Sequence, residues 1–247
     1  MTPVGYSHRG FSPDGAENSL AAFQAAVDLG YRHLETDARA TADGVAIAFH
    51  DPMLDRITNH TGRLAELPWT RVRQARILGR EPIPLLEDVL AGFPMARFNI
   101  DVKSDAAIGP TLDALRRTNS WHRVRLAAFS HRRVRTLRRV AGPAVAGALS
   151  PPEVAALKLG RLRRPAGLAG SAELPPAAQV PLGSATLPLI TERFVAAAHR
   201  LGLQVHAWTI NTRDEMTTLF DLGVDAIMSD RADVLRDVLR ERGAWPS

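Results

Sequence analysis

The feature that most constrains the fold of this chain is a regular alternation of short apolar segments with longer amphipathic ones. The strand-like segments VGYSHRG, ARFNIDVKS and RVRLAAFS are followed by SLAAFQAAVDLG, GPTLDALRRTN and HRRVRTLRRVAG, whose apolar residues have helical spacing. Such alternation is typical of parallel strands joined by right-handed helical crossovers. About eight strands fit into 247 residues, which predicts an α/β fold of the (β/α)8 TIM-barrel type.

The main alternative is a doubly wound open sheet. Neither a G-x-G-x-x-G motif nor a P-loop follows the first strand, so the usual reason to prefer that fold is missing. No break in composition marks a second domain. We therefore expect residues 1–247 to form a single TIM-barrel domain, with a short irregular insertion around residues 52–84. A second irregular region is expected at 161–188, which is rich in Pro, Gly and Ala.

Composition narrows the class of protein. The chain is 45% hydrophobic and 23% charged, which is ordinary for a soluble globular domain. No apolar stretch is long enough for a membrane span, and MTPVGYSHRG lacks the pattern of a signal peptide, so stable membrane insertion is not expected. Cysteine is absent, which excludes disulfides, thiolate metal sites and cysteine nucleophiles. We expect a cytoplasmic protein.

The net charge of +5 comes almost entirely from arginine and favours anionic partners. Nucleic acid is not the partner we expect. The densest basic run, HRRVRTLRR at 131–139, has no interleaved aromatic residue and matches no nucleic-acid-binding motif. We interpret it as the solvated face of an arginine-rich helix.

Several acidic residues lie in segments predicted to be buried strands, where a negative charge without a partner is unfavourable. Glu35 and Asp37 lie two positions apart in a predicted strand, so both side chains point to the same face. Asp101 alternates with apolar residues in FNIDVKS and can converge with them at the carboxyl end of the barrel. These carboxylates could be a solvated edge or structural ion pairs. Oxygen ligands without cysteine also suit a hard divalent cation, and we favour that interpretation.

Two histidines and two cations fall at neighbouring strand ends. His8 and Arg9 end the first strand, His50 ends the apolar run VAIAF, and Lys103 follows Asp101 on the same face. Each histidine could be a satisfied interior residue. Together with a metal ion, two imidazoles and two cations make a site for a phosphate ester.

The motifs together resemble the glycerophosphodiester phosphodiesterase family. They are HRG at 8–10, ENSLAAF at 17–23, ETDARATADGVAIAFHD at 35–51, PIPLLEDVL at 82–90, NIDVK at 99–103, HAWTIN at 206–211 and GVDAIMSD at 223–230. They come in the family's order. The resemblance implies a TIM barrel of the PLC-like phosphodiesterase type. It also implies an enzyme that hydrolyses small glycerophosphodiesters to sn-glycerol 3-phosphate and an alcohol, with metal dependence.

The resemblance also assigns roles to individual positions. It implies that His8 and His50 form an acid/base pair and that one divalent cation, Mg²⁺ or Ca²⁺ with Mn²⁺ as a further candidate, is held by carboxylates. The implied metal ligands are Glu35, Asp37 and Asp101, and the implied substrate-binding residues are Arg9, Lys103, Trp208, Glu17 and Asn18. Glu17 and Asn18 could instead cap the first helix.

Two departures and several alternatives remain. Asp101 stands where the family usually has Glu, and GAENS replaces the usual PENT. A phospholipase D-like activity on lysophospholipids and a catalytically inactive phosphodiester-binding barrel are alternatives to diester hydrolysis. The sequence leaves open the head group, the physiological metal, which histidine is the acid, and the oligomeric state. The nucleophile is water or the neighbouring hydroxyl of the substrate glycerol, and we favour the tethered hydroxyl.

Overall fold

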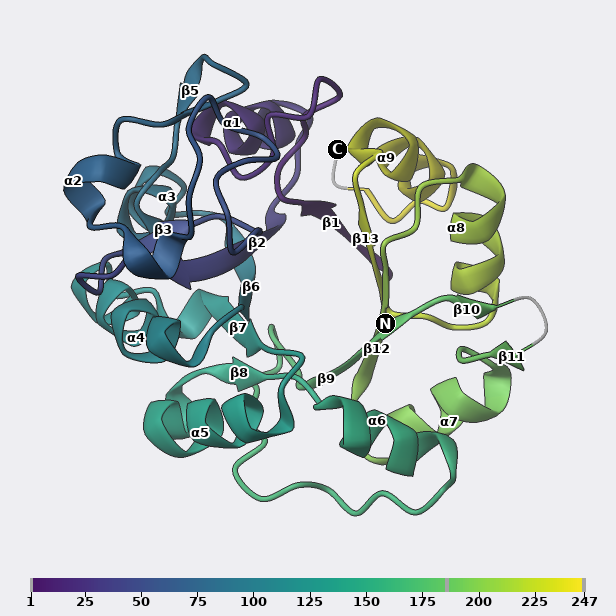
Figure 1. Cartoon of the computed structure of the whole chain (residues 1–247). Helices are drawn as coiled ribbons and strands as arrows, with labels where there is room; N and C mark the ends of the chain where they lie inside the picture. Colours follow the sequence, from purple (N-terminus) through teal and green to yellow (C-terminus); the bar gives the residue numbers. More distant parts are fainter. Residues whose placement is uncertain (1, 185–186, 246–247) are drawn as a thin grey trace.

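A ring of parallel strands forms the centre of the molecule (Figure 1). The computed structural model describes residues 2–184 and 187–245, and within them eight parallel strands pair in the order β8-β7-β6-β2-β1-β13-β12-β9. An isolated parallel bridge between Ala148 and Ala177 joins the two ends of this order. The predicted TIM barrel is therefore confirmed. The strands are β1 (Val4–His8), β2 (His33–Ala40), β6 (Arg97–Val102), β7 (Val124–Ala127), β8 (Ala146–Gly147), β9 (Ala177–Pro181), β12 (Gln204–Trp208) and β13 (Ala226–Ser229).

Helices surround the strands (Figure 1). They bury the outward-facing apolar side chains of the strands. On β6, Phe98 and Ile100 are fully buried in this outer core, while the alternate side chains point into the barrel. The helices are α1 (Leu20–Asp28), α3 (Leu86–Gly92), α4 (Ile108–Arg117), α5 (His131–Ala141), α6 (Pro151–Lys158), α7 (Glu192–Arg200), α8 (Arg213–Asp221) and α9 (Ala232–Glu241). Short 3₁₀ turns lie at Asp105–Ala107, Trp121–Arg123 and Gly142–Ala144.

The segment between β2 and α3 leaves the barrel pattern. It contains β3 (Ala46–Ala48), which pairs antiparallel with β2, a 3₁₀ turn (Leu64–Glu66), and α2 (Trp69–Val72). The two-residue strands β4 (Arg76–Ile77) and β5 (Glu81–Pro82) form a hairpin. The region expected to be irregular thus has its own small apolar cluster, which includes Phe49, Leu54, Leu64 and Ile77.

The second region expected to be irregular holds one barrel strand. Residues 161–176 contain no described helix or strand, and β9 then follows within the region expected to be irregular. A small antiparallel hairpin follows, made of β10 (Gly183–Ser184) and β11 (Leu187–Pro188). No helix within residues 2–184 and 187–245 is long and apolar enough to cross a membrane.

The arginine-rich helix α5 is less solvated than its sequence indicated. Arg138 is buried, and its guanidinium donates to both carboxylate oxygens of Glu153, at 2.6 and 2.8 Å. Arg133 reaches the carbonyl of Val102 at the end of β6. Arg132, Arg135 and Arg139 are exposed, as the interpretation of 131–139 as a solvated face predicted, but Arg133 and Arg138 depart from it because they tie α5 to the adjoining barrel loops.

The barrel interior below the site holds polar groups in contact with one another. Arg125 is fully buried, and it donates to the Tyr6 hydroxyl at 2.9 Å and to the Pro175 carbonyl at 2.6 Å. His33 packs edge-on against Tyr6, and burial with the neighbouring arginines lowers the pKa of His33 to about 3. Burial also lowers the pKa of His206 well below its usual value. Both imidazoles are therefore neutral near pH 7.

Candidate active site

The turn after β1 brings the first two candidate residues to the mouth of the barrel. Arg9 has a φ of +57° and Gly10 a φ of +81°, so the chain turns sharply after His8. A Cβ at position 10 would lie 2.6 Å from the backbone carbon of Ala22 in α1. Glycine is therefore required in HRG, since only its missing side chain lets α1 approach this turn.

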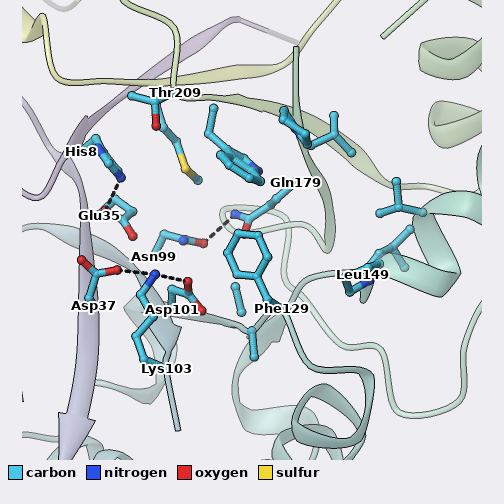
Figure 2. A pocket seen from close by; sticks show the side chains of 18 of the residues that line it. His8, Glu35, Asp37, Asn99, Asp101, Lys103, Phe129, Leu149, Gln179 and Thr209 are labelled. Atoms are coloured by element: carbon cyan, nitrogen blue, oxygen red, sulfur yellow. Dashed lines mark hydrogen bonds and ion pairs between the residues drawn. The ribbon is translucent and has the colours of Figure 1, made fainter. Parts of the chain in front are cut away.

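Three carboxylates and two cations lie close together in the barrel mouth. Asp37 on β2 and Asp101 on β6 are partners in the strand register, and the Lys103 ammonium lies between them at 2.8 and 2.6 Å (Figure 2). The Nε atom of Arg9 lies 3.0 Å from the other oxygen of Asp37. Glu35 lies beside this group and accepts from the Arg9 backbone N–H at 3.2 Å. The two cations lower the cost of burying these negative charges.

The three carboxylates do not share this compensation equally. Burial and the neighbouring Asp37 raise the pKa of Glu35 to about 7. Burial would also raise the pKa of Asp37, but Lys103 and Arg9 outweigh it and lower that pKa. Burial raises the pKa of Asp101 despite its contact with Lys103. Glu35 is thus the carboxylate whose negative charge is least compensated by its surroundings.

Each candidate acid/base histidine has a carboxylate on its Nδ1 atom. His8 Nδ1 lies 2.6 Å from Asp230, while its Nε2 atom lies 3.7 Å from Glu35 inside the cavity. His50 Nδ1 lies 2.7 Å from Asp51. A carboxylate at Nδ1 fixes the ring and its tautomer, which leaves Nε2 to exchange protons.

The two histidines are perturbed in opposite directions. Burial opposes protonation of His8, but Glu35 and Asp230 outweigh it and raise the pKa of His8. Burial dominates at His50 and lowers its pKa, although Asp37 and Asp51 act the other way. An acid/base pair needs one charged and one neutral group at the same pH, so this difference suits the chemistry expected of the pair.

The sequence reasoning missed the two aspartates that hold these rings. Asp230 is itself held by the Asn211 side chain, which donates to it at 2.9 Å. Asp51 is paired with Arg56. Asp51 follows His50 directly and could have been found from that spacing. Asp230 lies 222 residues from His8, and only the adjacency of β1 and β13 in the barrel brings the two together.

Eight of the ten predicted site residues line one cavity of about 680 Å³: His8, Arg9, Glu35, Asp37, His50, Asp101, Lys103 and Trp208. Glu17 and Asn18 lie behind them. Glu17 accepts from Arg9 Nη1 at 3.0 Å, and Asn18 Nδ2 donates to Asp37 at 2.9 Å. Neither caps α1, because the N-cap is Ser19, whose hydroxyl accepts from the Ala22 N–H. Both support charged residues of the site.

A second side of the same cavity is apolar and was not predicted. Phe129 follows β7, Leu149 follows β8, Val154 lies on α6 and Leu189 follows β11. Phe129 contacts the predicted substrate residue Trp208 edge-on, with 5.3 Å between ring centroids. Figure 2 shows the carboxylates and His8 on one side, and Phe129 and Leu149 on the other.

The carboxylates fit a hard divalent cation by their chemistry. Within the described part of the chain, no three acidic or histidine side chains are already grouped around one point as a metal site. Lys103 instead supplies positive charge between Asp37 and Asp101. However, the buried Oδ1 atom of Asp101 accepts no hydrogen bond from the described residues, and the buried Oδ1 atom of Asp37 pairs with Lys103. With the under-compensated Glu35, they offer an all-oxygen donor set of the kind Mg²⁺ and Ca²⁺ prefer.

Comparisons with known proteins show the family to which the chain belongs. Residues 8–234 match the model of the glycerophosphoryl diester phosphodiesterase family. The chain is 41% identical to the probable glycerophosphodiester phosphodiesterase 2 of Mycobacterium tuberculosis, over 98% of this chain and 92% of that protein. A crystal structure of a glycerophosphodiester phosphodiesterase from Agrobacterium tumefaciens has a TM-score of 0.77 at 20% identity, covering 94% of this chain and 98% of the other.

A further neighbour carries a bound product. The structure of an Oleispira antarctica phosphodiesterase in complex with sn-glycerol 3-phosphate has a TM-score of 0.77 at 19% identity, and the match covers 97% of both chains. The strand order and the family match together define a TIM-barrel phosphodiesterase. The chain belongs to the glycerophosphoryl diester phosphodiesterase family, and the predicted membership and enzyme class are confirmed.

Proposed function

We propose that this enzyme hydrolyses glycerophosphodiesters to sn-glycerol 3-phosphate and an alcohol. The observation that carries the proposal is the placing of His8 and His50, each with a carboxylate on Nδ1, in the cavity that also holds Arg9 and Lys103. The product bound by the Oleispira relative supports this substrate class. A barrel that only binds diesters has no need of two oriented imidazoles, so we favour catalysis over binding alone.

The two histidines move the protons of the reaction in this proposal. One accepts the proton of the attacking oxygen at Nε2, and the other donates a proton to the oxygen of the departing alcohol. We favour attack by the neighbouring hydroxyl of the substrate glycerol, because that oxygen is already tethered beside phosphorus. The bond from phosphorus to the departing oxygen breaks in this step, which leaves a cyclic phosphate. Water then opens the ring to sn-glycerol 3-phosphate, and the two histidines exchange their acid and base roles. A diester with a nitrophenyl leaving group separates the two roles. It should rescue the alanine variant of the acid and not that of the base.

Arg9 and Lys103 bind the phosphate in the same scheme. The Arg9 guanidinium is oriented by Asp37 and Glu17, at 3.0 Å each, so the side chain is held before substrate arrives. Preorganised cations stabilise charge that develops on the phosphate oxygens without the cost of reorganising in the transition state.

Glu35, Asp37 and Asp101 would hold one divalent cation, Mg²⁺ or Ca²⁺, with Mn²⁺ as a further candidate. When bound, such a cation stabilises negative charge on the phosphate and lowers the pKa of a coordinated hydroxyl. Its charge would also offset the burial of Glu35, whose raised pKa marks it as the least compensated of the three. The Asp101 side chain is shorter than the glutamate usual in the family, so we expect it to influence which of these ions binds best.

A panel of soluble diesters tests the proposal. The chelator-treated enzyme is assayed on glycerophosphocholine and glycerophosphoethanol with Mg²⁺, Mn²⁺ and Ca²⁺ added separately, and sn-glycerol 3-phosphate is quantified. We expect turnover that chelation abolishes and one of these ions restores. Full turnover after chelation would contradict the metal proposal alone. Failure on every diester with every ion would contradict the proposed hydrolysis. We propose a cytoplasmic role in lipid and glycerol metabolism with a small-molecule substrate, which this chemistry supports and a sequence without cysteine fits.

A further inference from the structure

The catalytic cavity has two chemically unlike halves. His8, the carboxylates, Arg9 and Lys103 make one half. The other half is lined by apolar side chains, among them Phe129, Leu149, Val154, Ala155, Leu189 and Trp208. A glycerol phosphate group needs only the charged half. Cavities of ~300–1,000 Å³ accept ligands of drug size, so a volume of about 680 Å³ leaves space beyond that group.

The apolar half of the cavity is formed by residues that are fixed to the barrel. Leu149 lies two residues after the end of β8, and its backbone N–H donates to the Ala177 carbonyl of β9 at 2.8 Å. The next residue, Ser150, forms a capping box with Glu153 that starts α6. Glu153 also pairs with the buried Arg138 of α5. The apolar half, called the wall below, includes Val154 and Ala155 of α6 and is therefore fixed to α5.

Phe129 stands where the two halves meet. Its ring packs against Trp208, and the Lys103 ammonium lies 5.6 Å from its centroid (Figure 2). The side chain is 58% exposed, which is unusual for phenylalanine and indicates a surface that a ligand covers. A chain that starts at the phosphate and passes Phe129 would continue along Leu149 and α6.

The charges of this half argue against a cationic occupant. Among the described lining residues, the carboxylates belong to the charged half, and the one charged side chain on α6 is Lys158. Its ammonium donates to the Pro188 carbonyl at 3.1 Å. A positive head group would therefore meet Lys158 at the edge of the wall, and the Asp37 and Asp101 carboxylates of the charged half are already paired with Lys103. An apolar chain carries no charge to be repelled, and its binding removes both its own apolar surface and that of the wall from water.

We propose that this wall is a subsite for an apolar chain carried by the phosphodiester, so that the enzyme prefers lipid-derived diesters to those with small or cationic alcohols. The inference rests on the proposed diester hydrolysis and specifies its substrate. The chain can be carried by the departing alcohol or by the glycerol, and both present the same hydrocarbon to the wall. Two substrate series distinguish these sources.

The test compares kcat/KM for diesters that differ only in their apolar part. One series has ethyl, butyl, hexyl and octyl esters of glycerol phosphate. The other is glycerophosphocholine without and with an octanoyl chain on glycerol. All are used below their micelle concentrations. Each methylene buried can contribute up to about fourfold, so we expect the octyl ester or the octanoyl lipid to exceed its short counterpart by at least about tenfold.

A charged substitution on the wall tests the subsite, and the same substitution outside the cavity is its control. Ala155 is an exposed alanine of α6 that lines the cavity, and Ala21 is an exposed alanine of α1 that is not among the lining residues. Ala155→Glu should lower the ratio of long-chain to short-chain kcat/KM by at least about tenfold. Ala21→Glu adds the same charge and should leave the ratio unchanged. Leu189→Ala, which shortens the wall, should lower the ratio by a smaller factor.

The outcomes separate this proposal from the one it rests on. A gain with chain length in either series, reduced by Ala155→Glu, supports the subsite and shows which alcohol carries the chain. Flat kcat/KM across both series in an enzyme that turns over the short diesters overturns the subsite and leaves the hydrolysis intact. A rise in glycerophosphocholine turnover in Ala155→Glu would assign the wall to cationic head groups and also overturn it. No turnover of any diester contradicts the proposed function itself.

Discussion

Replacing Asp230 with asparagine should lower the activity because it disturbs His8, while the fold stays intact. Asp230 accepts the Nδ1 hydrogen bond of His8 at 2.6 Å and is held by Asn211. The Asp230→Asn variant keeps the shape of the side chain but removes its charge. Its amide can also donate to Nδ1, which would move the imidazole proton to Nε2 and exchange the tautomer that Asp230 maintains.

The size of the effect follows from these contacts. A hydrogen bond to a charged group contributes ~1.5–3 kcal/mol and a neutral one ~0.5–1.5 kcal/mol, so loss of the charge alone costs about five- to tenfold. In the serine-protease triad, the same change costs about 10⁴ in kcat because the tautomer is wrong. The Asp230 side chain is 53% exposed, and water screens part of its charge. We therefore expect kcat to fall by about ten- to a hundredfold.

The pH dependence of kcat/KM distinguishes this role from a structural one. Burial acts to lower the pKa of His8, whereas Glu35 and Asp230 raise it. Loss of the Asp230 charge should therefore lower that pKa and move the limb of the profile that reports His8 to lower pH. Asp233→Asn is the control, because Asp233 is a nearby acidic residue that pairs with Arg231 outside the cavity. Wild-type kcat and an unshifted profile in Asp230→Asn would refute the positioning of His8.

Three further outcomes are expected. Glu153→Ala leaves Arg138 buried without its carboxylate, so urea denaturation should show a loss of ~3–5 kcal/mol; a loss below ~1 kcal/mol would contradict the importance of this pair. His33 has a pKa of about 3 when folded and about 6.5 when unfolded, so its contribution to stability is complete above pH 6.5 and declines toward pH 3, by ~2 kcal/mol at pH 5. His33→Phe should flatten that decline in thermal melts at several pH values, and an unchanged slope would exclude His33 as its source. Arg9→Lys should lower kcat/KM by an amount equivalent to a few kcal/mol, because the oriented guanidinium is lost; wild-type kinetics would argue against phosphate contact.

The barrel could be predicted because its local patterns agree with its global fold. Alternation along β6 separates Phe98 and Ile100, which face the helices, from Asp101 and Lys103, which face the cavity. This period-two pattern is a direct consequence of strand geometry. The charged half of the site followed from it, because the active site of a barrel lies at the carboxyl ends of the strands.

The features that sequence did not predict depend on long-range contacts. Asp230 reaches His8 only because β13 pairs with β1 to close the barrel. The apolar wall combines Phe129 from a loop, Val154 from α6 and Leu189 from beyond the hairpin, and no local pattern relates these three. Arg138 was interpreted as solvated because helical periodicity does not show which neighbour packs against a charged position.

Release of sn-glycerol 3-phosphate from glycerophosphoethanol tests whether His8 and His50 act as the acid/base pair. Wild-type enzyme, His8→Ala and His50→Ala are compared at equal concentration with the preferred cation, and circular dichroism confirms that both variants are folded. We expect the wild type to release the product and each variant to be at least about a hundredfold slower, since general acid and base catalysis each contribute ~10²–10⁴. Folded variants that keep more than about a tenth of wild-type turnover would contradict the acid/base pair on which the account depends.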